Sequence, residues 1–253
     1  MKISNPDIKH IPQLRALWQE AFGDSEEFLD LFFTSAFCTE RSVCITEINE
    51  VIAALYWFDC TLEGHKIAYI YAVATSIKHR SKGHCRKLME HTHTKLSQNG
   101  YKAAVLVPGS KGLFDMYEKL SYKICSYVNE SEFAPSSNKT EITQISKDEF
   151  AALRKTYLPK NAVIQEKENL DFLASYAEFY KGKDFVFVCS KDKEKLIVSE
   201  ILGNTNDAAC IVNTLGCKQG FFRTAGKLRP FAMWYDLSEG SISAPGYFGL
   251  AFD

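Results

Sequence analysis

The chain has 253 residues, of which 46% are hydrophobic and 13% aromatic, and its formal net charge is −1. That length suits one large domain or two small ones, and the balanced charge disfavours a general nucleic-acid binder, which needs a basic surface. No run approaches 18 consecutive apolar residues and the opening MKISNPDIKH contains no apolar signal core, so neither a membrane span nor a secretion signal is expected.

Cysteine and histidine usage predicts a reducing environment without a metal site. The eight cysteines are scattered, with no CxxC pair and no zinc-like spacing. A disulfide scaffold is short and dense in cysteine, and this chain is neither. His91 and His93 are two residues apart, so they point to different faces of a helix and do not share a metal. The sequence therefore predicts reduced thiols in a cytoplasmic protein.

The first half of the chain predicts a mixed α/β order. Apolar residues recur at helical spacing over residues 11–22, and Ser25 is a good N-cap for a second helix. The next segments are rich in β-branched and aromatic residues, and a parallel crossover is expected around the helix that follows Gly83. The expected elements are strands 42–48, 51–58 and 66–74, a helix from Gly83 to residue 98, strand 101–108, helix 112–120 and strand 122–133.

A Pro/Ser/Asn-rich linker, residues 134–140, precedes a second half with a similar order. Helix, helix, strand, strand, helix and strand follow one another in both halves. The expected elements are helices 147–156 and 166–180, strands 184–190 and 195–202, helix 206–215, strands 220–225 and 230–237, and a tail over 246–253. We therefore expect two domains, residues 1–134 and 141–253.

The stretch HRSKGHCRKLMEH, residues 79–91, predicts an anion-binding site. A strand ends before it and a helix begins at Gly83, so free backbone N–H groups and the positive end of the helix dipole favour an anion there. Gly83 lets the backbone approach the ligand without a Cβ, and Arg80 and Lys82 add positive charge. The nucleotide patterns GxxxxGK[ST] and GxGxxG are both absent. A pyrophosphate cradle of a different kind is the remaining interpretation.

These residues resemble the GNAT acetyltransferase superfamily. Its acetyl-CoA motif, Arg/Gln-x-x-Gly-x-Gly/Ala, is similar to the run from Arg80 to Cys85, and the preceding YAVATSIKHR resembles its fourth strand. Downstream, FDMYEKLSYK resembles the FYEKLGF signature and places Tyr117 at the tyrosine position. The resemblance covers Met1 to about Phe133. Two departures are Cys85 at the small final position, which tightens the cradle, and Ser121 in place of glycine, which is expected to be harmless.

The resemblance implies a fold, a cosubstrate and roles for particular residues. The fold is a mixed, mostly antiparallel sheet flanked by helices, and the cosubstrate is acetyl-CoA. Backbone groups of Val73, Ala74 and Thr75 would hold the pantetheine arm, and N–H groups near the first two would face the thioester carbonyl. Tyr117 would protonate the departing CoA thiolate. The residues implied to cradle the pyrophosphate are Arg80, Ser81, Lys82, Gly83, His84 and Cys85.

The implied reaction is N-acetylation of a primary amine, on a small molecule or a peptide, by direct attack on the thioester. The general base stays open. Glu47, Asp59 and Glu63 are near the third strand in sequence, and a water chain to solvent is an equal alternative. The terminal carboxylate of Asp253 is a further hypothesis. The acidic segment 23–30 is either a solvated first helical turn or a lip that attracts a cationic amine.

The second half resembles a degenerate acetyltransferase half, in a tandem architecture that also occurs in relatives of the enhanced-intracellular-survival acetyltransferases. We expect it to close one wall of the acceptor pocket. Its RTAGKL, residues 223–228, also fits Arg-x-x-Gly-x, but Arg229-Pro230 follows at once and proline prevents a helix from continuing there. We therefore predict a turn between strands rather than a second cradle.

Two rival functions remain at this point. A non-catalytic acyl-CoA-binding or sensing module is favoured by the missing base and disfavoured by Tyr117. An aminoacyl transferase that uses charged transfer RNA would show a basic face, which a nearly neutral chain does not support. The amine, the acyl chain length and the oligomeric state are left open by the sequence.

Overall fold

The computed structural model describes residues 1–252, and its contacts divide the chain into two compact units. Unit 1 comprises residues 1–123 and 234–244, and unit 2 comprises residues 124–233 with the C-terminal residues from Pro245 on. This division differs from the one expected at the 134–140 linker, because the first unit ends before the strand that precedes the linker and takes in a segment from near the C-terminus.

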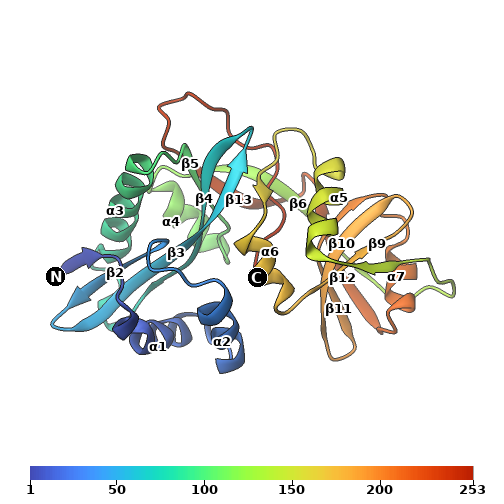
Figure 1. The fold of residues 1–253 in the computed structure, drawn as a ribbon, viewed down its shortest axis with the longest axis horizontal. Coiled ribbons are helices and arrows are strands. Elements are labelled where there is room, and N and C mark those ends of the chain that lie inside the picture. The colour runs from blue at the N-terminus through green and yellow to red at the C-terminus, as the bar shows by residue number, and fades with distance from the viewer. Residues whose placement is uncertain (253) are drawn as a thin grey trace. The chain divides into compact units, whose positions relative to one another are not determined.

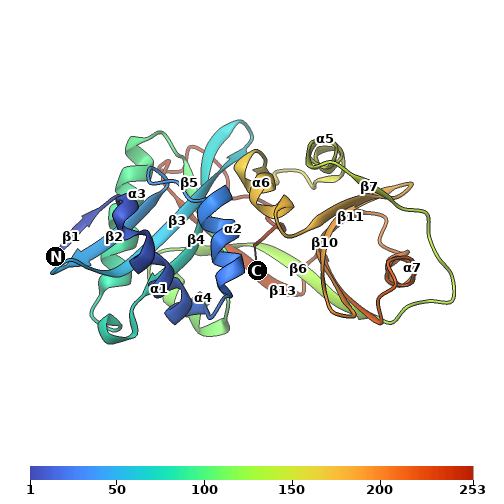
Figure 2. The ribbon, with the colours of Figure 1, turned by 60° about the horizontal axis from the view of Figure 1, so that its bottom comes forward.

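Unit 1 is built around five strands in the order β1-β2-β3-β4-β5 (Figure 1). All neighbouring pairs are antiparallel except β4 and β5, which are parallel and joined through α3, as the sequence predicts. Helices α1 and α2 lie on one side of the sheet and α3 and α4 on the other (Figures 1 and 2). The bounds are β1 Lys2–Ser4, β2 Ser42–Glu47, β3 Glu50–Leu62, β4 His65–Thr75, β5 Ala103–Leu106, α1 Ile11–Phe22, α2 Glu26–Ser35, α3 His84–Gln98 and α4 Lys111–Glu118, with 3-10 turns η1 Ile8–His10 and η2 Ile77–His79.

Aromatic side chains fill the space between α1, α2 and the sheet of unit 1. Trp18 on α1 is 2% exposed, and its ring centroid lies 4.6 Å from that of Phe32 on α2 and 5.4 Å from that of Tyr56 on β3. Its indole N–H donates to Asp24 at 2.7 Å, so the one polar atom of the ring has a partner. This packing fixes both helices against the sheet.

Unit 2 repeats the layout of antiparallel strands followed by a parallel crossover. Strands β10 and β11 are antiparallel, and β12 returns parallel to β11 after α7, with the order β6-β12-β11-β10-β9-β7. The bounds are β6 Lys123–Phe133, β7 Thr143–Ile145, β8 Ile164–Gln165, β9 Glu178–Lys181, β10 Phe185–Asp192, β11 Lys195–Gly203, β12 Gln219–Ala225, β13 Arg229–Asp236, α5 Lys147–Tyr157, α6 Glu168–Ala174 and α7 Ala208–Thr214. The fold class is therefore mixed α/β, as predicted.

Residues 166–180 depart from their predicted helix. The helix ends at Ala174, and residues 178–181 form β9, which pairs with both β7 and β10. Tyr180 stacks on Phe187 with ring centroids 5.2 Å apart, and Phe179 lies 4.7 Å from Phe150. Sheet pairing and aromatic packing thus override a local helical pattern.

Residues 226–228 form the predicted turn between β12 and β13, while residues 223–225 end β12. The side-chain oxygen of Asn129 accepts hydrogen bonds from the backbone N–H groups of Lys227 and Leu228, which holds the turn. Arg223 is buried, pairs with Glu130 at 3.2 Å and lies over the Phe231 ring at 4.5 Å. This arginine supports the sheet of unit 2 and offers no phosphate cradle.

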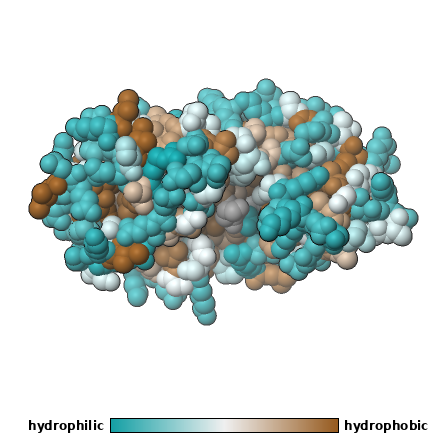
Figure 3. Space-filling view, turned by 90° about the horizontal axis from the view of Figure 1, so that it is seen from below, coloured by the Kyte–Doolittle hydropathy of each residue, from teal (hydrophilic) through white to brown (hydrophobic). Residues whose placement is uncertain are grey.

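The face of the molecule shown in Figure 3 is mostly polar. On the face shown in Figure 3, hydrophilic residues predominate and hydrophobic ones form small, separate patches. None of the helices in the described part of the chain combines the length and the apolar character that crossing a bilayer requires.

A buried ion pair lies in unit 2, between α5 and β11. Arg154 donates to the Glu200 carboxylate at 2.6 and 3.0 Å, and the Tyr247 hydroxyl donates to the same carboxylate at 3.0 Å. Both charged side chains are at most 2% exposed. Removing one member of such a pair leaves an unpaired buried charge, whereas removing both does not.

Arg154→Met is therefore expected to lower the free energy of unfolding by about 3–5 kcal/mol. The double variant Arg154→Met/Glu200→Leu is expected to recover most of that loss, because no unpaired charge remains. Urea unfolding of the wild type and both variants measures this. A double variant as unstable as the single one would contradict the interpretation.

His93 on α3 makes the stability of unit 1 depend on pH. Its Nε2 lies 2.8 Å from the Tyr122 hydroxyl, its ring stacks on Tyr235 at 4.0 Å, and burial lowers its pKa to about 4. An unfolded histidine has a pKa of about 6.5, so the unfolded state binds more protons between these values. Stability from this residue is fully present above about pH 6.5 and declines as the pH falls toward 4.

We expect the melting temperature of the wild type to fall between pH 7 and pH 5, and His93→Gln to reduce that fall because the titrating group is gone. His91→Gln, on an exposed position of the same helix, is the matched control and should retain the wild-type pH dependence. Equal pH profiles for all three proteins would contradict this account.

Candidate functional site

Strand β4 separates from β5 before it ends. The β4–β5 register ends at Tyr69 opposite Val105, while β4 continues to Thr75. On its other edge, Ala72 and Val73 together oppose the single residue Leu55 of β3, which is a β-bulge. Ala72 has φ +48°, in the left-handed region, at a strain of roughly 1 kcal/mol. The end of β4 is thus bent and presents backbone groups that β5 does not pair.

The loop after β4 delivers the chain to the start of α3. Ser81 has φ +60° and Gly83, the N-cap of α3, has φ +78°. Glycine adopts that conformation without strain, and a Cβ built at Gly83 would meet nothing within 4 Å. The helix N-terminus therefore faces open space, with its first N–H groups lacking partners inside the helix.

These features border one cavity of about 530 Å³ within unit 1. It brings together the end of β4, the loop before α3, the first residues of α3, one face of α4 and the end of α1. The residues that line it are Ala21, Phe22, Val73, Ala74, Thr75, His79, Arg80, Ser81, Gly83, His84, Cys85, Leu113, Met116 and Tyr117. Every site residue named from the sequence is among them except Lys82.

The cations of this segment differ in where they act. The Arg80 Nε donates to the Thr75 carbonyl at 3.1 Å, which anchors this side chain at the cavity wall. Lys82 turns back and donates to the Lys78 carbonyl at 2.9 Å, and Arg86 donates to the Lys119 carbonyl at 3.2 Å. Arg80 is thus the cation of this segment that lines the cavity.

Tyr117 and Cys85 supply the cavity with two protonated groups. Burial, followed by the neighbouring Cys85, raises the pKa of the 6%-exposed Tyr117. Burial also raises the pKa of the Cys85 thiol, with Arg86 acting in the opposite direction. Both groups therefore keep their protons at neutral pH, so the Tyr117 hydroxyl carries a proton at the cavity and the Cys85 thiol is a poor nucleophile.

The serine before Tyr122 lies just after the end of α4 in a strained backbone conformation. Ser121 has φ +68°, in the left-handed region that glycine occupies without strain. Having serine in place of glycine at this position, which the sequence analysis expects to be harmless, thus carries a backbone strain of roughly 1 kcal/mol. It does so while α4 still holds Tyr117 against Tyr122, with ring centroids 5.7 Å apart.

Two histidines line the cavity with incomplete hydrogen bonding. The Nδ1 atoms of His79 and His84 are buried, and neither has a hydrogen-bond partner among the described residues. The motif from Arg80 to Cys85 includes His84 but not His79, which directly precedes Arg80 and was not among the residues predicted for the site. No spacing marks His79, because its role depends on how η2 turns the loop.

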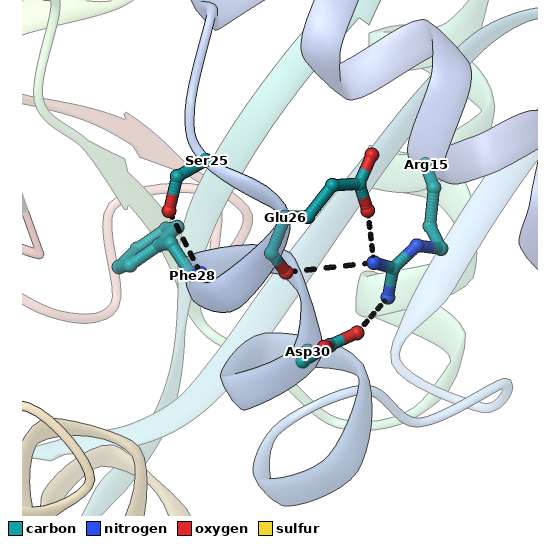
Figure 4. A network of polar contacts seen from close by, with 5 residues as sticks. All are labelled: Arg15, Ser25, Glu26, Phe28 and Asp30. Carbon is teal, nitrogen blue, oxygen red and sulfur yellow. Dashed lines mark hydrogen bonds and ion pairs between the residues drawn. The ribbon is translucent and has the colours of Figure 1, made fainter.

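Arg15 offsets part of the negative charge of the acidic segment 23–30 (Figure 4). The guanidinium of Arg15 pairs with Glu26 and, at 2.8 Å, with Asp30, while Asp24 accepts from Trp18. The Ser25 side chain accepts from the Phe28 N–H at 3.3 Å and caps α2. Three of the four carboxylates therefore help to hold α1 and α2 together, and the segment keeps a net negative charge.

The base candidates lie away from the cavity lining. Asp59 on β3 accepts from Tyr101 and pairs with Lys66 at 3.7 Å. Glu47 ends β2, and Glu63 lies in the exposed β3–β4 turn with φ +49°. None of these is among the residues that line the cavity. Asp253 lies outside the described residues.

Comparisons with known proteins agree with this architecture. Residues 2–125 match the family model described as an acetyltransferase (GNAT) domain, whereas no curated protein matches the sequence. Among solved structures, a GCN5-related N-acetyltransferase from Anabaena variabilis has a TM-score of 0.74 at 15% identity over 93% of this chain and 72% of its own.

Two further structures are similar over the same extent. A GCN5-related N-acetyltransferase from Kribbella flavida has a TM-score of 0.69 at 13% identity, covering 94% of this chain and 71% of its own. Eis1 from Mycobacterium abscessus has a TM-score of 0.65 at 12% identity, covering 94% and 74%. At these identities the structures establish a shared fold, which extends through unit 2. The family match over residues 2–125 shows that the first half of the chain contains a GNAT acetyltransferase domain.

Proposed function

We propose that the protein is an acetyl-CoA-dependent N-acetyltransferase that acts on a primary amine by direct attack on the thioester. The observation that carries the proposal is a single cavity. It is lined by the end of β4 that β5 does not pair, by the N-terminus of α3 and by the buried Tyr117. These are a carbonyl-binding edge, an anion site and an acid, the three elements that this acyl transfer needs.

The residues present fit such a cosubstrate. The Cβ position of Gly83 points into open space, and two buried imidazole nitrogens in the lining lack partners. In the proposal, Arg80, Ser81, Gly83, His84 and Cys85 hold the diphosphate, and Val73, Ala74 and Thr75 hold the pantetheine arm. Lys82 contributes from outside the lining, as positive charge at the loop.

When bound, the thioester supplies an electrophilic carbonyl and a thiolate leaving group. Backbone N–H groups near Val73 and Ala74 donate to the carbonyl oxygen as negative charge develops on it. One preorganised donor of this kind contributes about 2.7–4 kcal/mol. Tyr117 gives its proton to the thiolate. Because no Asp or Glu lines the cavity in the part of the chain that the structure describes, we propose that water carries the amine proton to solvent.

The acceptor is a small-molecule or peptide amine, and the compartment that we propose is the cytoplasm, since all eight cysteines are free thiols. Unit 2 is proposed to be a GNAT-like domain without a cofactor. Its equivalent crossover helix α7 has Asp207 at the N-cap, held by Thr140 at 2.7 Å. That carboxylate places negative charge where unit 1 has its cradle.

Arg80→Ala is expected to weaken acetyl-CoA binding by roughly 10-fold to 100-fold, since it removes a charged donor from the cavity wall. Lys82→Ala is the matched control and should change the affinity by only a few fold, because Lys82 turns back onto its own loop. Calorimetric titration of the three proteins measures both effects. Absence of binding to the wild type would overturn the proposal.

Tyr117→Phe is expected to lower kcat by about 10²–10⁴ with an unchanged Kd for acetyl-CoA, because it removes only the acid. Tyr127→Phe, at an exposed position, should keep the wild-type rate. Release of free thiol during turnover on a panel of amines is the readout. Tight binding with no turnover on any amine would instead favour the non-catalytic binding module.

A further inference from the structure

Two histidines in the cavity of unit 1 have an unmet requirement for hydrogen bonds. His79 ends η2 and His84 begins α3, and their ring centroids are 6.2 Å apart with the planes inclined at 66°. His84 is 9% exposed, and the Nδ1 of each ring is buried without a partner among the described residues. Leaving such atoms unpaired is unfavourable, so both rings can gain a hydrogen bond from a ligand, and a protonated ring would donate it.

The surroundings specify what kind of ligand this is. The same cavity contains the start of α3, with unpaired N–H groups, and the Arg80 side chain. The helix N–H groups and Arg80 are donors, both nitrogens of each imidazole donate once the ring is protonated, and no carboxylate is found in the lining among the described residues. A group that accepts from every one of them is a phosphoanion, and its negative charge beside an imidazole favours the protonated ring.

We propose that His79 and His84 couple binding of the diphosphate to proton uptake, so that affinity for the cosubstrate increases as the pH falls from about 8 to 6. The inference rests on the proposed function and deepens it, since it assigns a regulatory role to two side chains of the same site. Negative charge placed beside an imidazole favours its protonated form, so a bound diphosphate draws a proton onto the two rings.

The other charged and titratable side chains named at the site come from the loop, α3 and α4. The loop contributes Arg80, whose guanidinium stays charged, and the ammonium of Lys82, which is turned toward Lys78. Burial raises the pKa of Cys85 on α3 and of Tyr117 on α4 above their usual values. The end of α1 contributes Ala21 and Phe22, which carry no titratable side chain. A pH dependence between 6 and 8 therefore reports on the two histidines.

The test is calorimetric titration with S-acetyl dephospho-CoA at several pH values between 6 and 8. This probe lacks the 3′-phosphate, whose second pKa is near 6, and its acetylated sulfur cannot ionise, so its own charge stays constant. Titrations at pH 7 in two buffers with different heats of ionisation give the number of protons taken up by the wild type.

Two double variants distinguish hydrogen-bond donation to the ligand from protonation of the two imidazole rings. His79→Asn/His84→Asn keeps an amide donor near each Nδ1 position and cannot take up a proton. His79→Leu/His84→Leu removes the donors as well. Thermal melts show that each variant is folded.

For the wild type we expect Kd to fall by roughly 10-fold from pH 8 to pH 6, with net proton uptake. The Asn variant, whatever its affinity at pH 8, should show no such fall, and the Leu variant should bind more weakly than the Asn variant at every pH. Binding by the wild type that does not depend on pH, or an equal dependence in the Asn variant, would overturn the inference and leave the proposed function standing. Absence of any binding by the wild type would overturn both.

Discussion

The divergence of β4 from β5 is the constraint on which the rest of the site depends. Two parallel strands that stayed paired would consume the backbone groups at the end of β4 and would close the space in front of α3. The bulge at Ala72 and Val73 instead bends β4 away, and the strain at Ala72 is tolerated because the antiparallel pairing with β3 resumes on both sides of it. The cavity, the exposed helix N-terminus and the position of Tyr117 follow from this one separation.

The sequence predicts unit 1 well because local patterns and tertiary packing agree there. The apolar spacing in α1 faces the aromatic core, and Gly83 marks a conformation that few other residues adopt without strain. The prediction fails where the local sequence pattern and the tertiary packing favour different structures. Residues 166–180 carry helical spacing, but Phe179 and Tyr180 are recruited into a sheet. No local pattern marks a bulge inside an uninterrupted β-rich run or a histidine such as His79, whose importance depends on a cavity that long-range packing creates.

Unit 2 contains the same crossover with different groups at the start of its helix. Its parallel pair and intervening helix repeat the plan of unit 1, yet α7 has seven residues where α3 has 15. Thr140 donates a hydrogen bond to Asp207 at the N-cap of α7, and Arg223 pairs with Glu130. The carboxylate at this N-cap and the internally paired arginine contrast with Gly83 and Arg80 in unit 1, which supports the proposal that unit 2 holds no cofactor.

The pairing of Arg15 with Glu26 and Asp30 has a consequence for the electrostatics beside the cavity of unit 1. One guanidinium offsets the charge of one of the two carboxylates that it contacts, and Asp24 and Glu27 belong to the same segment, so the segment keeps a net negative charge directly after Ala21 and Phe22 of the lining. For the proposed amine acceptor, an exposed negative field of this kind favours the approach of a cation, and salt screens it. Contact with the apolar residues Phe22, Leu113 and Met116 would then favour acceptors by the shape and apolar area of the group that carries the nitrogen.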